Sequence, residues 1–72
     1  MRATAIWATP EALVVVVEGG TVSIPWDRCS GRLARASQAE RELAERSPSG
    51  YGIHWPLIDE HLAVGPLVRL VG

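Results

Sequence analysis

The feature that most constrains this chain is a run of four valines, Val14 to Val17, followed almost at once by Gly19-Gly20. β-Branched side chains fit a pleated, half-buried strand better than a helix. Paired glycines supply the positive φ angles that a two-residue hairpin turn uses. The sequence therefore predicts a hairpin with strands at 12–18 and 21–26, preceded by a further strand over 3–8.

The register of this hairpin follows from a turn placed at Gly19 and Gly20. Direct cross-strand partners share a face of the sheet. Six apolar residues are then expected on one face, namely Val17 opposite Val22, Val15 opposite Ile24, and Leu13 opposite Trp26. The other face carries Glu18, Thr21, Ser23 and Pro25, with Val14 and Val16 among them. These two valines are either covered by the protein itself or form an apolar patch that docks a partner.

The second half of the chain contains a helix signal and a further strand. Ser37-Gln38-Ala39-Glu40 is a capping-box pattern, which predicts a helix from about Gln38 to Arg46 with a Glu42–Arg46 pair on its solvent side. The segment 51–55 is typical of a strand that ends at Pro56. We therefore expect a single α+β domain over residues 1–72, with a small antiparallel sheet, an N-terminal hairpin and one helix packed on the apolar face of the sheet.

Length and charge narrow the classes of function. A chain of 72 residues buries only about 60% of its unfolded surface, so a protein partner or self-association would add burial. Seven basic and eight acidic side chains create no strong field toward nucleic acid or anionic lipid. The longest apolar run, Ala12 to Val17, is far shorter than the roughly 20 residues that span a bilayer. No signal-peptide pattern opens the chain, and the single Cys29 fits a reducing compartment, so we expect a cytoplasmic protein.

Two groups of residues contain side chains that could bind a metal or act in catalysis. The segment from His54 to His61 holds two imidazoles and two carboxylates, but their spacing matches neither a helical pair nor a closed zinc set, and Pro56 disfavours a helix there. Cys29 with His54 and Asp59 could be drawn as nucleophile, base and orienter, although a free cysteine is more often a small buried hydrophobe. We therefore expect no metal, no cofactor and no enzymatic activity.

Charged side chains suggest two surfaces. We interpret the basic stretch 28–41 as a solvent-exposed face, because the chain is nearly neutral and lacks a recognition-helix pattern. We therefore expect no direct nucleic-acid binding and no membrane binding. The acidic side chains would form one surface if the helix lay beside the last strand, and such a surface would suit a basic protein or imitate a phosphate array. The candidate partner-binding residues are therefore Glu40, Glu42, Glu45, Asp59, Glu60, Val14 and Val16.

Three motifs occur in order along the chain. They are Gly20 with Ile24-Pro25, the pattern R-L-x-x-A-S-x-x-E-R from Arg32 to Arg41, and G-I-H-W-P-L-I-D-E from Gly52 to Glu60, continued by Leu62 and Val64. On these residues the segment 20–67 resembles the bacterial domain of unknown function 2442 family. Two positions depart from the family pattern: His61 stands where the family tends to be acidic, and Pro66 predicts that a short closing helix is shifted or absent.

The resemblance implies a small α+β domain, sometimes fused to a helix-turn-helix, whose stand-alone members are often encoded beside another small protein, as toxin–antitoxin modules are. It implies no catalytic residues. We therefore expect a non-catalytic protein–protein interaction module, the antitoxin-like component of a bacterial two-protein module, which binds another protein or a second copy of itself. The alternative is a phage-borne inhibitor of a bacterial defence complex of the CRISPR type, acting through an acidic, DNA-mimicking surface. A toxin-like neighbouring gene would favour the first function, and a prophage location the second.

Overall fold

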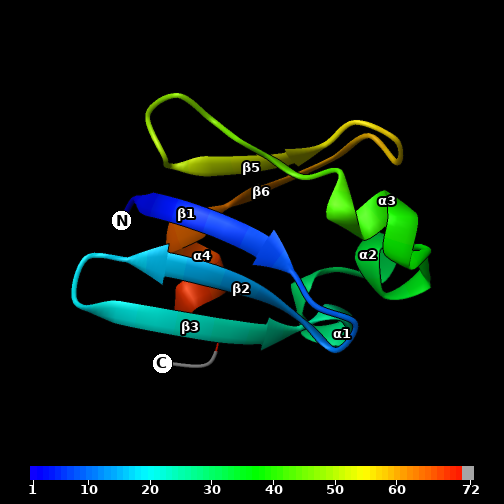
Figure 1. Ribbon diagram of the computed structural model, residues 1–72, viewed down its shortest axis with the longest axis horizontal. Coiled ribbons are helices and arrows are strands. Elements are labelled where there is room, and N and C mark those ends of the chain that lie inside the picture. Colours follow the sequence, from blue (N-terminus) through cyan, green and yellow to red (C-terminus); the bar gives the residue numbers. More distant parts are fainter. Residues whose placement is uncertain (71–72) are drawn as a thin grey trace.

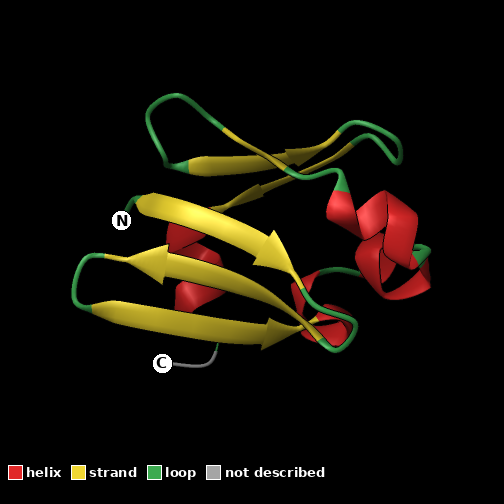
Figure 2. Ribbon diagram, viewed as in Figure 1, coloured by secondary structure: helices red, strands yellow, loops and turns green. Residues whose placement is uncertain are grey.

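The computed structural model describes residues 1–70 of the chain, so the last two residues of the expected single domain lie outside it. The described part forms two three-stranded antiparallel sheets and four short helices (Figures 1 and 2). The α+β class with antiparallel sheets is therefore confirmed. The elements are β1 (Ala3–Ala8), β2 (Ala12–Val17), β3 (Gly20–Pro25), α1 (Trp26–Cys29), α2 (Gly31–Arg35), α3 (Gln38–Glu42), β4 (Glu45–Arg46), β5 (Gly52–Trp55), β6 (Glu60–Ala63) and α4 (Val64–Arg69).

The first sheet has the order β1-β2-β3 and is covered on one face only. Leu13, Val15 and Ile24 are completely buried on that face, and Ile6 packs against them. Helix α4 lies behind the sheet in Figure 1 and contributes Val64 and Leu67 to the same core. The helix on the apolar face is thus α4, whereas the capping-box helix α3 lies at the end of the sheet (Figure 1).

The predicted register of the hairpin is wrong by two residues. Val17 lies opposite Gly20, Val15 opposite Val22, and Leu13 opposite Ile24, so the turn consists of Glu18 and Gly19. One residue with positive φ is enough for this turn, and Gly19 supplies it with a φ of 94°. Gly20 is therefore not needed in the turn, and it pairs with Val17 as the first residue of β3. A shift of two residues leaves every side chain on its predicted face, except that Trp26 begins α1 instead of ending the strand.

The predicted helix from Gln38 to Arg46 ends four residues early. Its capping box is present, with Ser37 Oγ accepting from the Glu40 amide and Glu40 Oε1 accepting from the Ser37 amide. The helix ends at Glu42 because the next residues turn to form β4, which pairs with β5. Tertiary strand pairing here overrides the local helix preference. The expected Glu42–Arg46 pair is therefore wrong, and Arg46 donates to the Ala3 carbonyl instead, at 3.3 Å.

Two tryptophans hold the helices against the strands. Trp55 is fully buried and Trp26 is 3% exposed, and their rings meet edge to face with centroids 6.5 Å apart. The Arg41 guanidinium lies over the Trp26 ring at 5.0 Å and donates to the carbonyl oxygens of α2 residues Leu33 and Ala34. Trp55 Nε1 donates back to the Arg41 carbonyl at 3.2 Å. Arg41 is thus a structural clamp between α2 and the aromatic core.

The two sheets are joined at the start of the chain. The Ala3 amide donates to the Gly50 carbonyl at 2.7 Å, and Gly50 has a φ of 82°. A Cβ atom at Gly50 would lie 2.7 Å from the Ala3 oxygen, so only glycine fits this close approach.

Helix α4 forms despite Pro66, so the expectation of a shifted or absent closing helix is wrong. Pro66 is the third residue of the helix, where the amide has no intrahelical acceptor, and a proline in the first turn therefore sacrifices no helical hydrogen bond. None of the helices within residues 1–70 is long and apolar enough to cross a membrane.

Candidate functional site

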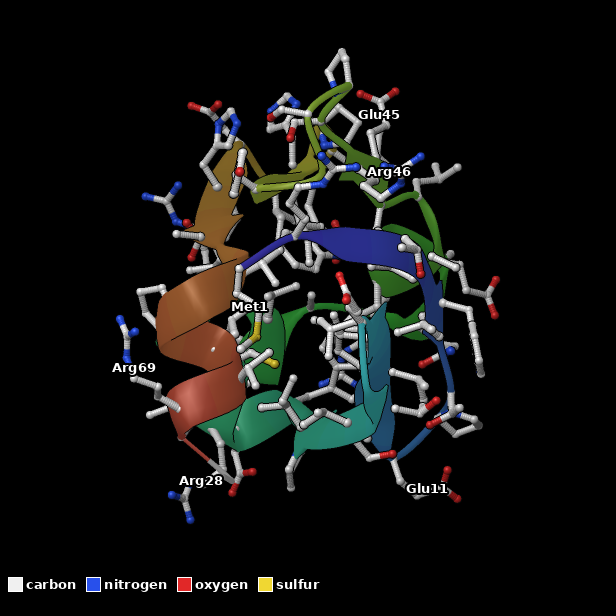
Figure 3. All side chains as sticks on the ribbon, turned by 90° about the vertical axis from the view of Figure 1, so that its left-hand side faces the viewer. Met1, Glu11, Arg28, Glu45, Arg46 and Arg69 are labelled. Atoms are coloured by element: carbon white, nitrogen blue, oxygen red, sulfur yellow. The ribbon has the colours of Figure 1, made fainter. Side chains whose placement is uncertain are left out.

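The first sheet carries an uncharged face that none of the helices covers (Figures 1 and 3). Trp7 lies directly opposite Val14, and Val16 lies between Ala5 on one side and Thr21 on the other. Trp7 is 50% exposed, although a tryptophan is large enough to fill much of a small core. We call this surface the open face; its residues are Ala5, Trp7, Val14, Val16, Thr21 and Ser23.

The open face is a small surface with an apolar part. Three strands of six residues cover about 300 Å² in projection, and within this area Trp7 is half-exposed, Val16 is partly exposed and Val14 is 7% exposed. Val14 and Val16, which sequence reasoning chose as candidates, lie together at its centre. Trp7 was missed, because Ile6 and Trp7 are both apolar and their alternation alone does not show which of them faces the core.

Three of the five acidic candidates accept a hydrogen bond from a nearby group of the chain. Glu40 caps its own helix, Glu42 accepts from Gln38, and Glu60 accepts from the His61 amide. They come from separate segments: Glu40 and Glu42 from α3, Glu45 from β4, Asp59 from the turn before β6, and Glu60 from β6. Arg32 approaches the same turn and donates to the Asp59 carbonyl at 2.8 Å. The carboxylates of Glu40, Glu42 and Glu60 therefore already have a partner within the chain.

The second sheet, of order β4-β5-β6, has a polar outer face. His54 and His61 are cross-strand partners whose rings stack with centroids 4.5 Å apart, and His54 Nδ1 lies 3.9 Å from a carboxylate oxygen of Glu45. Stacked rings hold their nitrogens in parallel planes, so the nitrogens do not converge on one point. Within residues 1–70 no group of three His, Cys, Asp or Glu residues is arranged to hold a metal ion.

Cys29 is buried and its thiol contacts the Ile24 carbonyl oxygen at 3.7 Å. Burial raises the pKa of the Cys29 thiol from 9.0 to about 11, against an opposing effect of the Arg41 charge. The thiol is therefore neutral at physiological pH, whereas a cysteine nucleophile acts as the thiolate. His54 contacts His61 and Glu45 on the other sheet, so the sketched Cys29–His54–Asp59 arrangement finds no support in these contacts.

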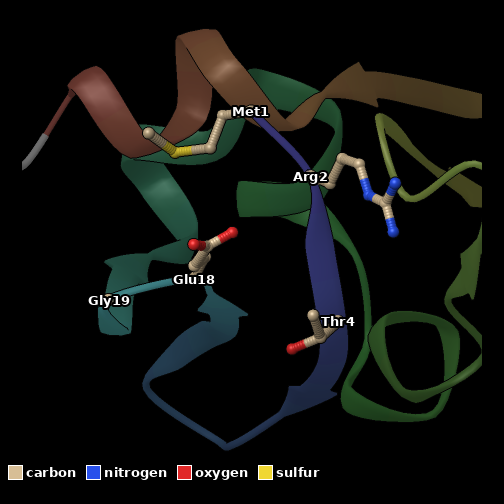
Figure 4. A pocket seen from close by; sticks show the side chains of 5 residues that line it. All are labelled: Met1, Arg2, Thr4, Glu18 and Gly19. Carbon is tan, nitrogen blue, oxygen red and sulfur yellow. The ribbon is translucent and has the colours of Figure 1, made fainter.

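A depression lies at the end of the first sheet, next to the N-terminus (Figure 4). Its lining consists of Met1, Arg2, Thr4, Glu18 and Gly19. The Arg2 side chain points away from the Glu18 carboxylate, so the two charges do not meet in it (Figure 4). Ligand pockets usually combine apolar walls with a few convergent polar groups, and the charged groups of this depression do not converge.

Three arginines of the basic stretch make contacts within the chain. Arg28 donates to the Leu70 carbonyl at 3.2 Å, and Arg32 donates to the carbonyls of Ile58 and Asp59. Arg41 is the clamp described above. These guanidinium groups connect segments that are distant in the sequence.

Comparison with known proteins confirms the family resemblance. A family model described as "Protein of unknown function (DUF2442)" matches residues 3–71. The chain belongs to this family. A crystal structure described as a protein of unknown function from Rhodospirillum rubrum ATCC 11170 is similar to the DUF2442 chain, with a TM-score of 0.82 and 27% identity over 94% of this chain and 84% of that one. A search of curated proteins found no match.

Proposed function

We propose that this DUF2442 protein is a non-catalytic protein-binding module that docks its partner on the open face. The observation that carries the proposal is the half-exposed Trp7, beside the partly exposed Val16 and the buried Val14, on a sheet face without charge or covering helix. Exposed tryptophans beside apolar residues are among the side chains that most often dominate protein–protein binding. A chain of this size also gains from the additional burial.

Within this function we propose the role of the antitoxin-like component of a two-protein module, with the partner encoded by the adjacent gene. The partner surface would be apolar, because the open face offers hydroxyl and apolar groups and no ion-pair donors. The acidic alternative, inhibition of a defence complex by DNA mimicry, has weaker support, since the carboxylates of Glu40 and Glu60 are engaged within the chain.

The test is co-expression of the tagged chain with the product of the adjacent gene. We expect recovery of both chains in near-equal amounts. Trp7→Lys should weaken the complex at least about a hundredfold, because truncating a central aromatic anchor commonly costs 2 kcal/mol or more and the ammonium group would also be desolvated. The matched control is Tyr51→Lys, which replaces an aromatic residue of similar exposure, 55%, in the loop before β5.

Equal loss of binding in the two variants would overturn the assignment of the open face. Loss of binding in a Glu42→Gln, Glu45→Gln variant, with Trp7→Lys still binding, would favour the acidic surface instead. A circular dichroism melting curve of each variant establishes that it is folded.

A further inference from the structure

Strand β3 forms one edge of the first sheet, and this edge is unpaired within residues 1–70. Val17 and Gly20 close the two-residue turn, and such a closing pair exchanges both of its backbone hydrogen bonds. Because hydrogen-bonded pairs alternate along an antiparallel ladder, Val22 and Ile24 also direct their backbone groups toward β2. The N–H and C=O groups of Thr21 and Ser23 therefore point outward from the edge.

We propose that a second copy of this chain pairs with the β3 edge in antiparallel orientation, about a two-fold axis through Val22. In this register Thr21 of each copy lies opposite Ser23 of the other. The two residues then exchange four backbone hydrogen bonds, and every outward N–H and C=O group of both is satisfied. The inference goes beyond the proposed function, because it concerns the outward backbone groups of Thr21 and Ser23, whereas the open face is formed by side chains.

The composition of β3 favours this partner over continued exposure to solvent. Natural edge strands are commonly protected by charged side chains, and β3, with the sequence G-T-V-S-I-P, contains none. Its single proline, Pro25, is the last residue of the strand and lies outside the Thr21–Ser23 exchange. The proposed register places Pro25 opposite Gly19 of the other copy, and a Cβ atom at Gly19 or Gly20 would meet nothing within 4 Å. The space for the end of the second strand is therefore free.

The pairing also changes the area available for docking. The open face of one chain covers about 300 Å² in projection, well below the roughly 800 Å² that each partner of a standard stable interface buries. A two-fold axis perpendicular to the sheet puts both open faces on the same side of one six-stranded sheet. The paired copies would present about 600 Å².

The experiment measures mass against concentration by sedimentation equilibrium on the purified chain. We expect a reversible dimer with twice the 7.8 kDa mass of one chain. Ser23→Pro removes an outward N–H without touching the β2 ladder, and should raise the dimer dissociation constant at least about tenfold, while Ser23→Thr keeps the N–H and should leave it unchanged. A monomer at every concentration would overturn the proposal.

A second pair of variants tests the register by charge and does not depend on the folding of the proline variant. The double variant Thr21→Glu, Ser23→Glu places carboxylates directly opposite each other in the proposed register and should abolish the dimer. The double variant Thr21→Glu, Ser23→Lys places opposite charges there and should keep it. Equal dissociation constants for these two variants would overturn the register. A dimer that is lost in Trp7→Lys but kept in Ser23→Pro would instead assign self-association to the open face. Binding of the adjacent gene product is measured separately, by the co-expression experiment above.

Discussion

The two sheets of this protein bury one face each, and their outer faces differ. The outer face of the first sheet presents Trp7 and part of Val16, whereas that of the second presents His54, His61 and Glu45. Water solvates the imidazoles and the carboxylate well. The first sheet instead exposes apolar area, which is costly to leave in water. The most motif-rich segment therefore builds the scaffold, and the plainer N-terminal strands carry the surface that we assign to binding.

The largest expected effect separates the tryptophans of the two sheets. Trp55→Ala should lower the free energy of unfolding by about 3–5 kcal/mol, because the fully buried ring leaves a cavity and the Arg41 carbonyl loses its donor. Trp7→Ala should cost about 1 kcal/mol or less, since half of this side chain is already in water. Urea unfolding followed by circular dichroism measures both, and equal losses would remove the distinction between core and surface tryptophan.

The junction between the sheets is tested by a glycine pair. Gly50→Ala should destabilise the protein by about 2–3 kcal/mol or more, because it combines a positive φ with a Cβ atom 2.7 Å from the Ala3 oxygen. Gly19→Ala has the same kind of φ but open space around it, and should cost about 1 kcal/mol. Thermal melting of the two variants gives the difference, which would vanish if the Ala3–Gly50 contact did not form in solution.

The arginine clamp should have a smaller effect. Arg41→Lys removes the two-carbonyl contact with α2 and weakens the interaction with the Trp26 ring, so we expect a loss of about 1–2 kcal/mol. Arg35→Lys, an exposed arginine at the end of α2, is the matched control and should change stability by less than about 0.5 kcal/mol. Chemical denaturation midpoints compare the two, and equal midpoints would mean that Arg41 acts as an ordinary surface charge.

The smallest effect concerns pH. The pKa of Cys29 is about 11 in the folded chain and 9.0 as a free thiol, so the unfolded chain loses its proton first as the pH rises. The contribution of Cys29 is therefore fully present below pH 9 and declines between pH 9 and pH 11. Unfolding midpoints measured across this range should fall, and Cys29→Ala should flatten that part of the slope. An unchanged slope in the variant would mean that other groups cause the decline.

Local patterns predicted much of the fold. The valine run gave the strands of the hairpin and their faces, and Ser37 with Glu40 gave the start of α3. The exact register failed because two adjacent glycines leave the turn position open until the whole sheet is assembled. The end of α3 failed because β4 forms only by pairing with β5, a contact that no local pattern contains. At the candidate site, Val14 and Val16 were identified from alternation, while Trp7 required knowledge of which face of β1 is buried.

The hydrogen bond between Ala3 and Gly50 affects the order in which the nascent chain folds. During translation the β2–β3 hairpin can form as soon as it leaves the ribosome, because its contacts are local. The outer edge of β1 has to wait for residues that are made more than forty positions later. Until then the first sheet has two open edges, and this interval is when the nascent chain is most exposed to aggregation.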